Sequence, residues 1–409
     1  MVRVALVGFT GYGHSLARQV ITASAEVDCR LVAAADNQMH LAPRRAAELK
    51  AAGVELFDDA LKMFADLRGK CEAVCIATGI NSHAPLTIAA LKAGYFVHLE
   101  KPPAATVQEV DQMLEVLETT GLFCQVGFQA VHGIDLAWVK DKLVAGALGK
   151  VRTIVCRAGW PRDAKYYART DWAGKLRSGR SWVLDGPAMN ALAHQTNNMM
   201  WMASSEPLGY GTPVQVRAEL YAAGPVESHN TAAIEIRTAE GPTAYFLGSH
   251  TTAGRFGPII EVQGERARLR WEYDIGATIH HSDGRSERSP EGSDKARERM
   301  IANFIQAVRT RDGSILRCPL AKARSFVLAL NGAHESSGEI LRIDEKFVST
   351  HKPGTPEAWT VVDGMDELLI AAAAQPGLLS DLPNAPSWAR KTQAFDLAGY
   401  KSFPQRFKG

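Results

Sequence analysis

The sequence predicts an α/β protein with a doubly wound parallel sheet at its N-terminal end, followed by an α+β domain with an open, mainly antiparallel sheet. Two observations predict this class. Residues 2–128 alternate short β-branched apolar runs with longer helical patterns, which is typical of parallel strands joined by right-handed crossover helices. Residues 151–271 carry strand-like runs that follow one another through turns with few helices between them, as in an antiparallel sheet.

The N-terminal half alternates predicted strands with predicted helices. We expect strands over residues 3–7, 30–35, 73–77, 96–99 and 123–128, and helices over residues 14–25, 42–52, 84–93 and 107–119. The runs at 4–7 and 73–77 are almost wholly apolar, as strands covered by helices on both faces are. We therefore expect residues 1–128 to form a nucleotide-binding domain.

Residues 129–345 are predicted to form the second domain. We expect helices over residues 135–144, 294–311 and 320–337, and strands over 151–158, 214–221, 231–237, 244–250, 259–263 and 267–271. Residues 346–409 contain one helical stretch at 364–374 among proline-containing turns and several aromatic residues. Such a segment is too aromatic to stay free in solution. We expect an ordered C-terminal arm that wraps a neighbouring subunit.

Composition excludes several classes of protein. The net charge of +2 is far from the basic balance of a nucleic-acid-binding domain, so we expect no nucleic-acid partner. No apolar run approaches the roughly 18 residues that span a bilayer, and the first strand is not part of a signal peptide. The six cysteines form no C-x-x-C pair, and Cys71 and Cys75 lack further soft ligands nearby. We expect a cytoplasmic protein with reduced cysteines and no metal site.

A glycine-rich turn follows the first predicted strand. The run Gly8-Phe9-Thr10-Gly11-Tyr12-Gly13 lies between a strand and a helix, where glycines let the backbone approach a pyrophosphate; the alternative is a plain tight turn. Thr10 stands where the second glycine of G-x-G-x-x-G is expected, and a phasing G-x-T-G-x-G is also open. Asp36 ends the second strand, where a carboxylate accepts hydrogen bonds from the adenosine ribose. This favours NAD, although Arg44 and Arg45 leave NADP possible.

Two linked stretches carry a specific resemblance. Residues 73–83 end a strand in a polar loop, and residues 89–102 run from a helix through Ala93-Gly94 into a strand that ends in Glu100-Lys101-Pro102. This order resembles the family of glucose-fructose oxidoreductase, inositol 2-dehydrogenase and rhizopine-catabolism proteins, over about residues 2–345. The resemblance implies a Rossmann domain that binds NAD(P), with Asn81 and His83 in a loop along the cofactor.

Lys101 is the first catalytic candidate. A lysine at the carboxyl end of a parallel strand lies where such sheets bind ligands, and there it can stabilise the alkoxide that forms as hydride leaves. The usual alternative for a lysine is a solvated surface charge. The expected cofactor contacts are Gly8, Thr10, Gly11, Tyr12, Gly13, Asp36, Thr78, Asn81, His83, Glu100, Lys101 and Gln129.

Residues 185–201 predict a buried helix that starts near Pro187, because no charged residue follows as far as residue 203. Asn190, His194 and Asn197 recur at helical spacing and are expected to share one face. A bound polyol and the nicotinamide amide would supply partners for this polar stripe. The alternative is a satisfied core histidine.

The family carries D-x-x-x-H in this helix, and the resemblance therefore assigns roles. Asn190 stands where many members have aspartate. We expect His194 to act as the general base, since its ordinary pKa suits proton transfer at neutral pH. Asn190 would orient substrate hydroxyls, and Asp185 would help to start the helix.

The basic-aromatic segment, residues 157–182, has a net charge of +5, which leaves −3 for the rest of the chain. Aromatic faces stack on sugar rings, while arginines and lysines bind hydroxyls, carboxylates or phosphates. The alternative is a solvated loop with aromatic side chains tucked beneath it. The expected substrate contacts are Lys101, Arg162, Tyr166, Arg169, Trp172, Asn190 and His194.

We therefore expect an NAD(P)-dependent dehydrogenase that moves hydride between a secondary alcohol of a sugar, polyol or sugar acid and nicotinamide. Lys101 and His194 are expected to meet across a cleft. Two alternatives remain open: an NAD-dependent glycosidase with a redox-neutral oxidation and elimination mechanism, and a non-catalytic regulator that responds to sugar or NAD. The family also implies a homo-oligomer, a dimer or a tetramer, which commonly forms through the outer face of the second sheet.

Overall fold

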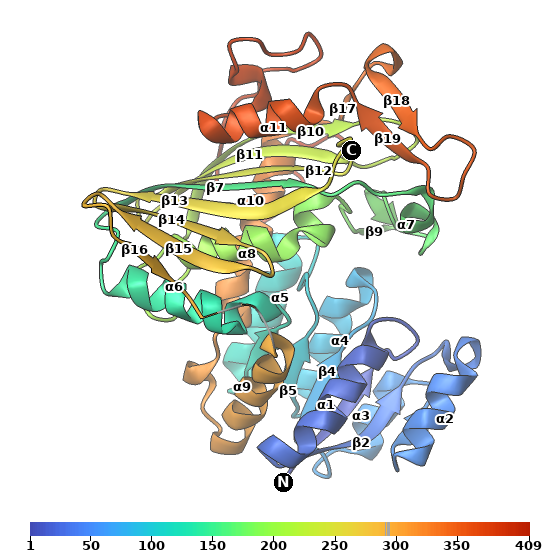
Figure 1. Ribbon diagram of the computed structural model, residues 1–409. Coiled ribbons are helices and arrows are strands. Elements are labelled where there is room, and N and C mark those ends of the chain that lie inside the picture. Colours follow the sequence, from blue (N-terminus) through green and yellow to red (C-terminus); the bar gives the residue numbers. More distant parts are fainter. Residues whose placement is uncertain (291, 293–294) are drawn as a thin grey trace. The chain divides into compact units, whose positions relative to one another are not determined.

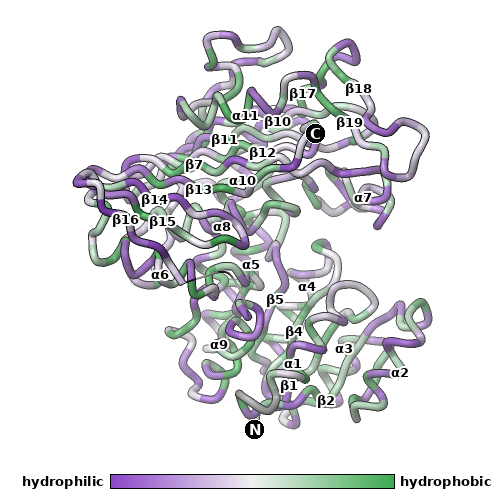
Figure 2. Tube along the Cα trace, viewed as in Figure 1, coloured by the Kyte–Doolittle hydropathy of each residue, from purple (hydrophilic) through white to green (hydrophobic). Residues whose placement is uncertain are grey.

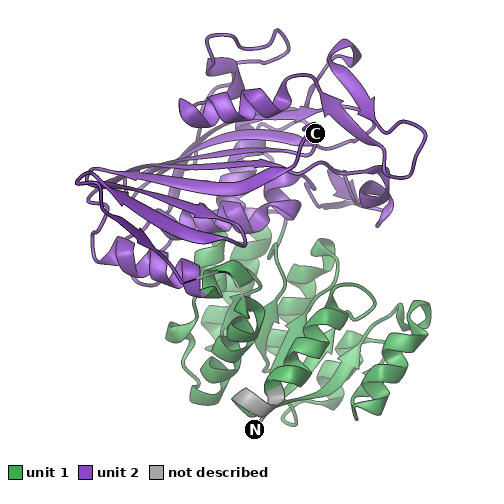
Figure 3. Cartoon of the chain, viewed as in Figure 1, with its two compact units in different colours: residues 1–104, 108–133, 295–324 green, residues 105–107, 134–294, 325–409 purple. Residues whose placement is uncertain are grey.

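The computed structural model describes residues 1–290, 292 and 295–409. The chain separates into two compact units, coloured in Figure 3. Unit 1 consists of residues 1–104, 108–133 and 295–324, and unit 2 of residues 105–107, 134–294 and 325–409. Of the helices in the described part, none combines the length and the apolar character that a membrane span requires.

Unit 1 contains a six-stranded parallel sheet in the order β3-β2-β1-β4-β5-β6 (Figure 1). Its strands are β1 (Val2–Val7), β2 (Cys29–Ala35), β3 (Glu55–Phe57), β4 (Ala73–Ile76), β5 (Phe96–Leu99) and β6 (Cys124–Val126). Every residue of β4 is buried and apolar. Figure 2 colours the chain by hydropathy, with apolar residues in green. The predicted doubly wound parallel sheet is confirmed, and the short strand β3 is additional to the prediction.

The helices of unit 1 follow the predicted alternation. They are α1 (Gly13–Val27), α2 (Pro43–Ala51), α3 (Ala60–Asp66), α4 (Ile80–Lys92), α5 (Val107–Thr120) and α9 (Ala296–Thr310). Helix α3 was not predicted, and α4 begins four residues earlier than expected. Asn81 and His83 therefore lie in the first turn of α4 and not in a loop, with Pro85 inside the helix.

The hydrophobic core of unit 1 includes a helix from much later in the chain. Met300, Ile301 and Phe304 of α9 are buried in the same cluster as Val4 of β1 and Leu16 of α1. This packing is why residues 295–324 belong to unit 1 although they follow the second sheet in sequence. The domain limits at 128 and 345 stay predictions.

Unit 2 contains a ten-stranded mixed sheet. The order is β16-β15-β14-β13-β7-β12-β11-β10-β17, with β20 also paired to β10, and most neighbours are antiparallel. The strands are β7 (Val151–Gly159), β10 (Pro213–Ala222), β11 (Thr231–Thr238), β12 (Thr243–Ser249), β13 (Phe256–Gly264), β14 (Ala267–Glu272), β15 (Gly276–His281), β16 (Ser286–Arg288), β17 (Leu341–Arg342) and β20 (Phe395–Asp396). This confirms the predicted α+β domain and adds four short strands.

Helices lie on both faces of this sheet. Figure 1 shows α8 (Ala193–Met202) on one face and α11 (Met365–Ala374) on the other, and both contact β7 and β12. The remaining helices of unit 2 are α6 (Ile134–Val144), α7 (Ala164–Ala168) and most of α10 (Leu320–Ser337). Two hairpins, β8 (Arg177–Ser178) with β9 (Ser181–Trp182) and β18 (Val348–His351) with β19 (Trp359–Val362), complete the unit.

The C-terminal segment, residues 346–409, packs on unit 2 of its own chain. Met365 and Leu369 of α11 share a buried cluster with Val155 and Leu247 of the large sheet. Two buried glutamates bind the segment through hydrogen bonds: Glu219 accepts from Ser380, and Glu335 accepts from residues 400–407. Large apolar side chains of this segment, among them Leu369 and Trp388, are buried within unit 2, and the expected wrapping of a neighbouring subunit stays a prediction.

Candidate functional site

The glycine turn after β1 fits closely against its neighbours. Gly8 has φ +86°, and a Cβ there would lie 2.7 Å from the Ala77 carbonyl oxygen. A Cβ on Gly13 would lie 1.7 Å from the Gly8 carbonyl oxygen. Only glycine fits at either position, which makes them the first and third glycines of the motif, with Thr10 between them.

We expect Gly13→Ala to weaken NADH binding by roughly 10- to 100-fold, because a methyl group cannot enter this turn without moving the backbone. Thr22→Ala, at an exposed position of α1 outside the turn, is the control. Fluorescence titration with NADH measures both. Equal affinities in the two variants would contradict this account of the turn.

Asp36 binds the glycine turn in this structure. One carboxylate oxygen accepts from the backbone N–H groups of Phe9 and Thr10 at 2.7 and 2.8 Å, and the other accepts from Gln38 N–H at 2.8 Å. Arg45 donates to the carbonyl oxygens of Thr10 and Gly11 on the same turn. Asp36 therefore holds the turn in shape, and its predicted contact with the ribose stays a prediction.

The segment after β5 adjoins this turn at the carboxyl end of the sheet. Gly8 and Ala77 directly follow β1 and β4, and Glu100 N–H donates to Ile76 O at 2.8 Å. His83 lies 2.8 Å from Pro102 O through Nδ1 and 3.1 Å from Thr78 O through Nε2. The buried ring thus ties the loop after β4 to the residue beside Lys101.

Glu100 is a buried carboxylate next to Lys101. It is 7% exposed, and one oxygen accepts from Lys101 N–H at 3.1 Å. The other oxygen, Oε1, is buried without a hydrogen-bond partner among the described residues. Burial raises the pKa of Glu100 to about 7, although the Lys101 charge opposes this. Glu100 thus offers a buried polar atom beside the glycine turn, within reach of a bound polar group.

We expect Glu100→Gln to stabilise the protein more at about pH 8.5 than at about pH 5. From the ordinary pKa of 4.5 up to about 7, the folded state holds more protons than the unfolded state, so stability falls as the pH rises. Above about pH 7, ionisation of the buried Glu100 lowers the stability of the folded state by about 3 kcal/mol. Glutamine avoids this cost because it does not ionise. Melting temperatures without cofactor measure the difference. The exposed Glu118→Gln is the control, and a gain that does not depend on pH would contradict the assignment.

The other predicted cofactor residues lie around the same edge. Tyr12 is 42% exposed and has the Arg297 guanidinium 6.0 Å from its ring. Asn81 is exposed on the first turn of α4, with Oδ1 beside Gly79. Gln129 begins the short helix that follows β6 and is partly exposed. All of these residues belong to unit 1.

In unit 2, the predicted helix from Pro187 is interrupted. Residues Pro187–Ala191 form a π-helical turn, and Leu192 N–H donates to Pro187 O at 2.8 Å before α8 begins. This adds a residue to one turn, so Asn190 and His194 do not follow the spacing of an uninterrupted α-helix. Between 187 and 202, Asn190, Ala191 and His194 are the residues that are not buried. His194 and Asn197 both lie in α8, whereas Asn190 precedes it in the π-turn, and Asn197 is fully buried; the predicted shared face stays a prediction.

Asp185 lies at the start of this turn, directly before the N-cap residue Gly186. It is 3% exposed; Oδ1 accepts from Asn190 Nδ2 at 2.9 Å, and Oδ2 accepts from Gly174 N–H at 2.6 Å. The Arg169 guanidinium lies 3.9 Å from Oδ2. Asp185 therefore joins Asn190 to the basic-aromatic segment and orients its amide. Sequence reasoning placed Asp185 at the helix start and missed its contacts with Asn190 and Gly174, because Asp185 precedes the N-cap residue Gly186 and no helical spacing applies to it.

The predicted substrate residues of the basic-aromatic segment form a row of stacked contacts. The Tyr166 ring has the guanidinium of Arg162 at 4.6 Å and that of Arg169 at 3.6 Å. Arg169 also lies 5.2 Å from the Trp172 ring. Burial raises the pKa of Tyr166 to about 12, so its hydroxyl stays protonated at neutral pH. Unit 2 thus links Arg162, Tyr166, Arg169, Trp172 and Asn190 through direct contacts.

His250 is a further neighbour that the sequence did not indicate. It directly follows β12 and packs edge-on against the Tyr166 ring at 5.7 Å, with Nδ1 3.4 Å from the Tyr167 hydroxyl. Nothing in the local sequence distinguishes it from a core histidine. Lys101 lies in unit 1 and His194 lies in unit 2.

Comparison with known proteins covers both units. Residues 2–128 match the family profile "Oxidoreductase family, NAD-binding Rossmann fold", and residues 131–270 match "GFO/IDH/MocA C-terminal domain". Inositol 2-dehydrogenase of Rubrobacter xylanophilus is 28% identical over 361 residues, 87% of this chain and 85% of that protein. The scyllo-inositol 2-dehydrogenase (NAD(+)) of Bacillus subtilis is 29% identical over 36% of this chain and 42% of that protein.

Solved structures share the fold. The WlbA dehydrogenase of Bordetella pertussis, crystallised with NADH and UDP-GlcNAcA, has a TM-score of 0.66 and 20% identity, covering 82% of this chain and 96% of that one. A putative myo-inositol dehydrogenase of Sinorhizobium meliloti has a TM-score of 0.63 and 21% identity, covering 82% and 97%.

Proposed function

The chain belongs to the GFO/IDH/MocA family of NAD-binding oxidoreductases, and from this premise we propose that it oxidises a secondary alcohol of a sugar, polyol or sugar acid. It is an NAD(P)-dependent dehydrogenase. Two of the relatives named above, those of Rubrobacter xylanophilus and Bacillus subtilis, are inositol dehydrogenases by name, which supports a small polyhydroxylated substrate.

The carboxyl edge of the parallel sheet fits a dinucleotide. The turn from Gly8 to Gly13 leaves no room for a Cβ at its first and third glycines, and such a turn lets a pyrophosphate approach the start of α1. Glu100 Oε1 is a buried acceptor or donor that lacks a protein partner among the described residues. When bound, NAD supplies the nicotinamide that accepts hydride. We propose that the cofactor is held by the glycine turn together with Asp36, Thr78 and Glu100.

His194 is proposed to take the proton from the substrate hydroxyl, and Lys101 to stabilise the oxygen as negative charge develops on it. Asn190 donates to Asp185, so its carbonyl oxygen is turned to accept from a substrate hydroxyl. In this scheme Asp185 is a positioning residue, and Asn190 takes no proton.

One observation carries the proposal: the glycine turn, Thr78 and Lys101 all follow the carboxyl ends of neighbouring strands. The test has two steps. Thermal shift with NAD and NADP shows cofactor binding, because a ligand that binds the folded state raises its melting temperature. Turnover of inositols, sugars and sugar acids is then followed by the absorbance of reduced nicotinamide. Failure to bind either cofactor contradicts the proposal, and so does product formation without reduced nicotinamide.

A further inference from the structure

Buried polar atoms that no described residue satisfies lie in the basic-aromatic segment and in the residues that directly follow β12. Arg162 Nε, His250 Nε2 and Thr252 Oγ1 are buried and have no hydrogen-bond partner in the part of the chain that the structure describes. His250 is 3% exposed and Thr252 is fully buried. Buried polar atoms in folded proteins nearly always have partners, so this group indicates a partner that the chain does not supply.

These atoms belong to one neighbourhood. The backbone N–H of Arg162 donates to the backbone carbonyl oxygen of His250 at 3.3 Å. The Tyr166 ring contacts both the Arg162 guanidinium and the His250 ring. Thr252 is two residues beyond His250. Burial, with the charges of Arg162 and Arg169 nearby, holds the pKa of His250 well below its ordinary value. His250 is therefore neutral, with an N–H group on one ring nitrogen.

Positive charge exceeds negative charge in this neighbourhood. The guanidiniums of Arg162 and Arg255 lie 5.1 and 4.8 Å from the Trp160 ring, and Arg169 stacks on Tyr166. Within the described residues, Arg169 has a carboxylate near it, that of Asp185 at 3.9 Å, while neither Arg162 nor Arg255 has one within ion-pair distance. Stacking on aromatic rings fixes the guanidinium planes and leaves their N–H edges to bind another group.

We propose, resting on the proposed function, that the substrate carries an anionic oxygen group, a carboxylate or a phosphate ester, which binds Arg162 with Arg169 beside it. The fork of a guanidinium matches two oxygens of such a group. Contacts then run from Arg169 through Asp185 to Asn190, four residues before His194. The anionic end of the substrate binds at the arginine end of this row, and its reacting carbon binds at the Asn190 end. A sugar acid or sugar phosphate is thus the substrate class, rather than a neutral polyol.

The experiment compares charged and neutral probes in the presence of NADH at matched ionic strength. The probes are D-gluconate, D-glucuronate and D-glucose 6-phosphate against D-glucose, D-sorbitol and myo-inositol, and thermal shift titration gives apparent affinities. We expect at least one anionic probe to bind roughly 10- to 100-fold more tightly than its neutral counterpart. Binding of the acids assigns the group as a carboxylate, and binding of the phosphate alone assigns it as a phosphate ester.

Two variants show whether Arg162 causes the preference. Arg162→Gln is expected to remove it, whereas Arg180→Gln, an exposed arginine of the same segment, is expected to keep it. The inference is overturned if neutral probes bind as well as anionic ones, if no anionic probe binds, or if the preference persists in Arg162→Gln. NADH titration of the same samples tests the cofactor site separately, so retained NADH binding without an anion preference overturns this inference alone.

Discussion

His194→Ala is expected to lower kcat by about 10²- to 10⁴-fold, which is the usual contribution of a general base. NADH affinity is expected to stay within about twofold, because the glycine turn belongs to unit 1 and does not include this histidine. The measurement is turnover with a substrate identified by the screen, alongside NADH titration. His280→Ala, which removes an exposed histidine of β15, is the matched control.

A variant of Lys101, the other catalytic candidate, tests the same proton transfer. Lys101→Met is expected to lower kcat by about 10²- to 10³-fold, with the exposed Lys92→Met as its control. Residues that act in the same step are not additive, so the double variant is expected to lose little more than the worse single variant. Unchanged turnover in either single variant, or two independent losses that multiply in full, would contradict the proposed proton transfer.

Glu335→Ala is expected to destabilise unit 2 by about 3 to 5 kcal/mol. Glu335 is fully buried and accepts from Tyr400 OH and from the backbone N–H groups of Gln405, Arg406 and Phe407, all at 2.6 to 2.8 Å. Alanine leaves these donors without an acceptor. The readouts are the melting temperature, hydrogen exchange of residues 400–407 and the KM for substrate.

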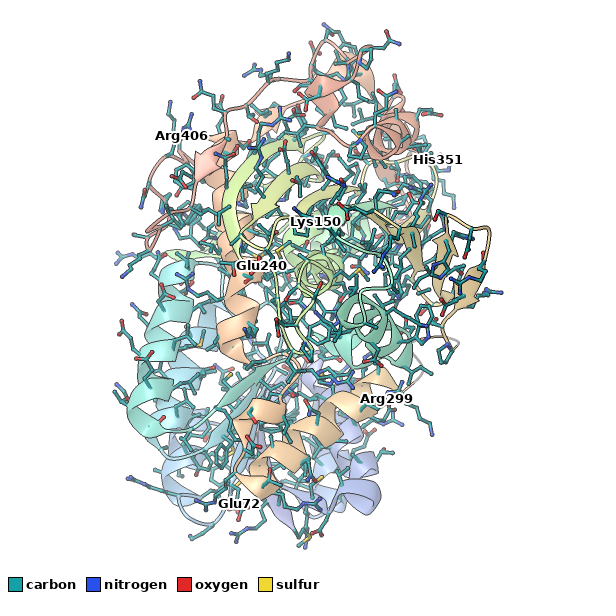
Figure 4. All side chains as sticks on the ribbon, turned by 90° about the vertical axis from the view of Figure 1, so that its left-hand side faces the viewer. Glu72, Lys150, Glu240, Arg299, His351 and Arg406 are labelled. Carbon is teal, nitrogen blue, oxygen red and sulfur yellow. The ribbon has the colours of Figure 1, made fainter. Side chains whose placement is uncertain are left out.

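The control for this variant is Arg406→Ala. Arg406, labelled in Figure 4, binds Glu335 through its backbone, while its side chain donates to Gln393 at an exposed position. Its removal is expected to cost less than about 1 kcal/mol. KM is included because Phe403 packs on Trp182 at 5.2 Å, at the end of the basic-aromatic segment. A Glu335→Ala variant as stable as wild type would show that these hydrogen bonds make no net contribution to the free energy of unfolding.

Much of the fold follows from local pattern. The apolar runs that became β1 and β4 are long enough and uniform enough to specify buried parallel strands, and the glycine turn and Glu100-Lys101-Pro102 mark their carboxyl ends. Strand β3 and helix α3 lack such a pattern: Glu55 is exposed, and only Phe57 of that strand is buried. The pairing of β3 with β2 and the packing of α3 against β2 and α4 decide their structure, and neither is a local property.

The site was predictable where chemistry follows strand ends and not where it depends on distant packing. Asp185 lies before the N-cap residue Gly186, outside the helical pattern, so no helical period predicts its contact with Asn190. Asp36 was placed correctly at the end of β2, but its hydrogen bonds to the glycine turn come from a neighbouring strand. The C-terminal segment is bound by Glu219 and Glu335, whose partners Ser380 and Tyr400 lie far from them in the sequence, so no local pattern predicts these contacts.

The packing of α9 has a consequence for how the protein is made. Met300 and Phe304 close the core that β1 and α1 begin, and the ribosome adds them only after strands β7 to β16. While residues 1–294 emerge, the nucleotide-binding unit exposes the apolar surface that α9 will cover, so it remains incomplete while strands β7 to β16 are made. The unit that begins first thus waits for most of the second sheet before its core can close, and we expect the nascent chain to bind NAD only after α9 has emerged.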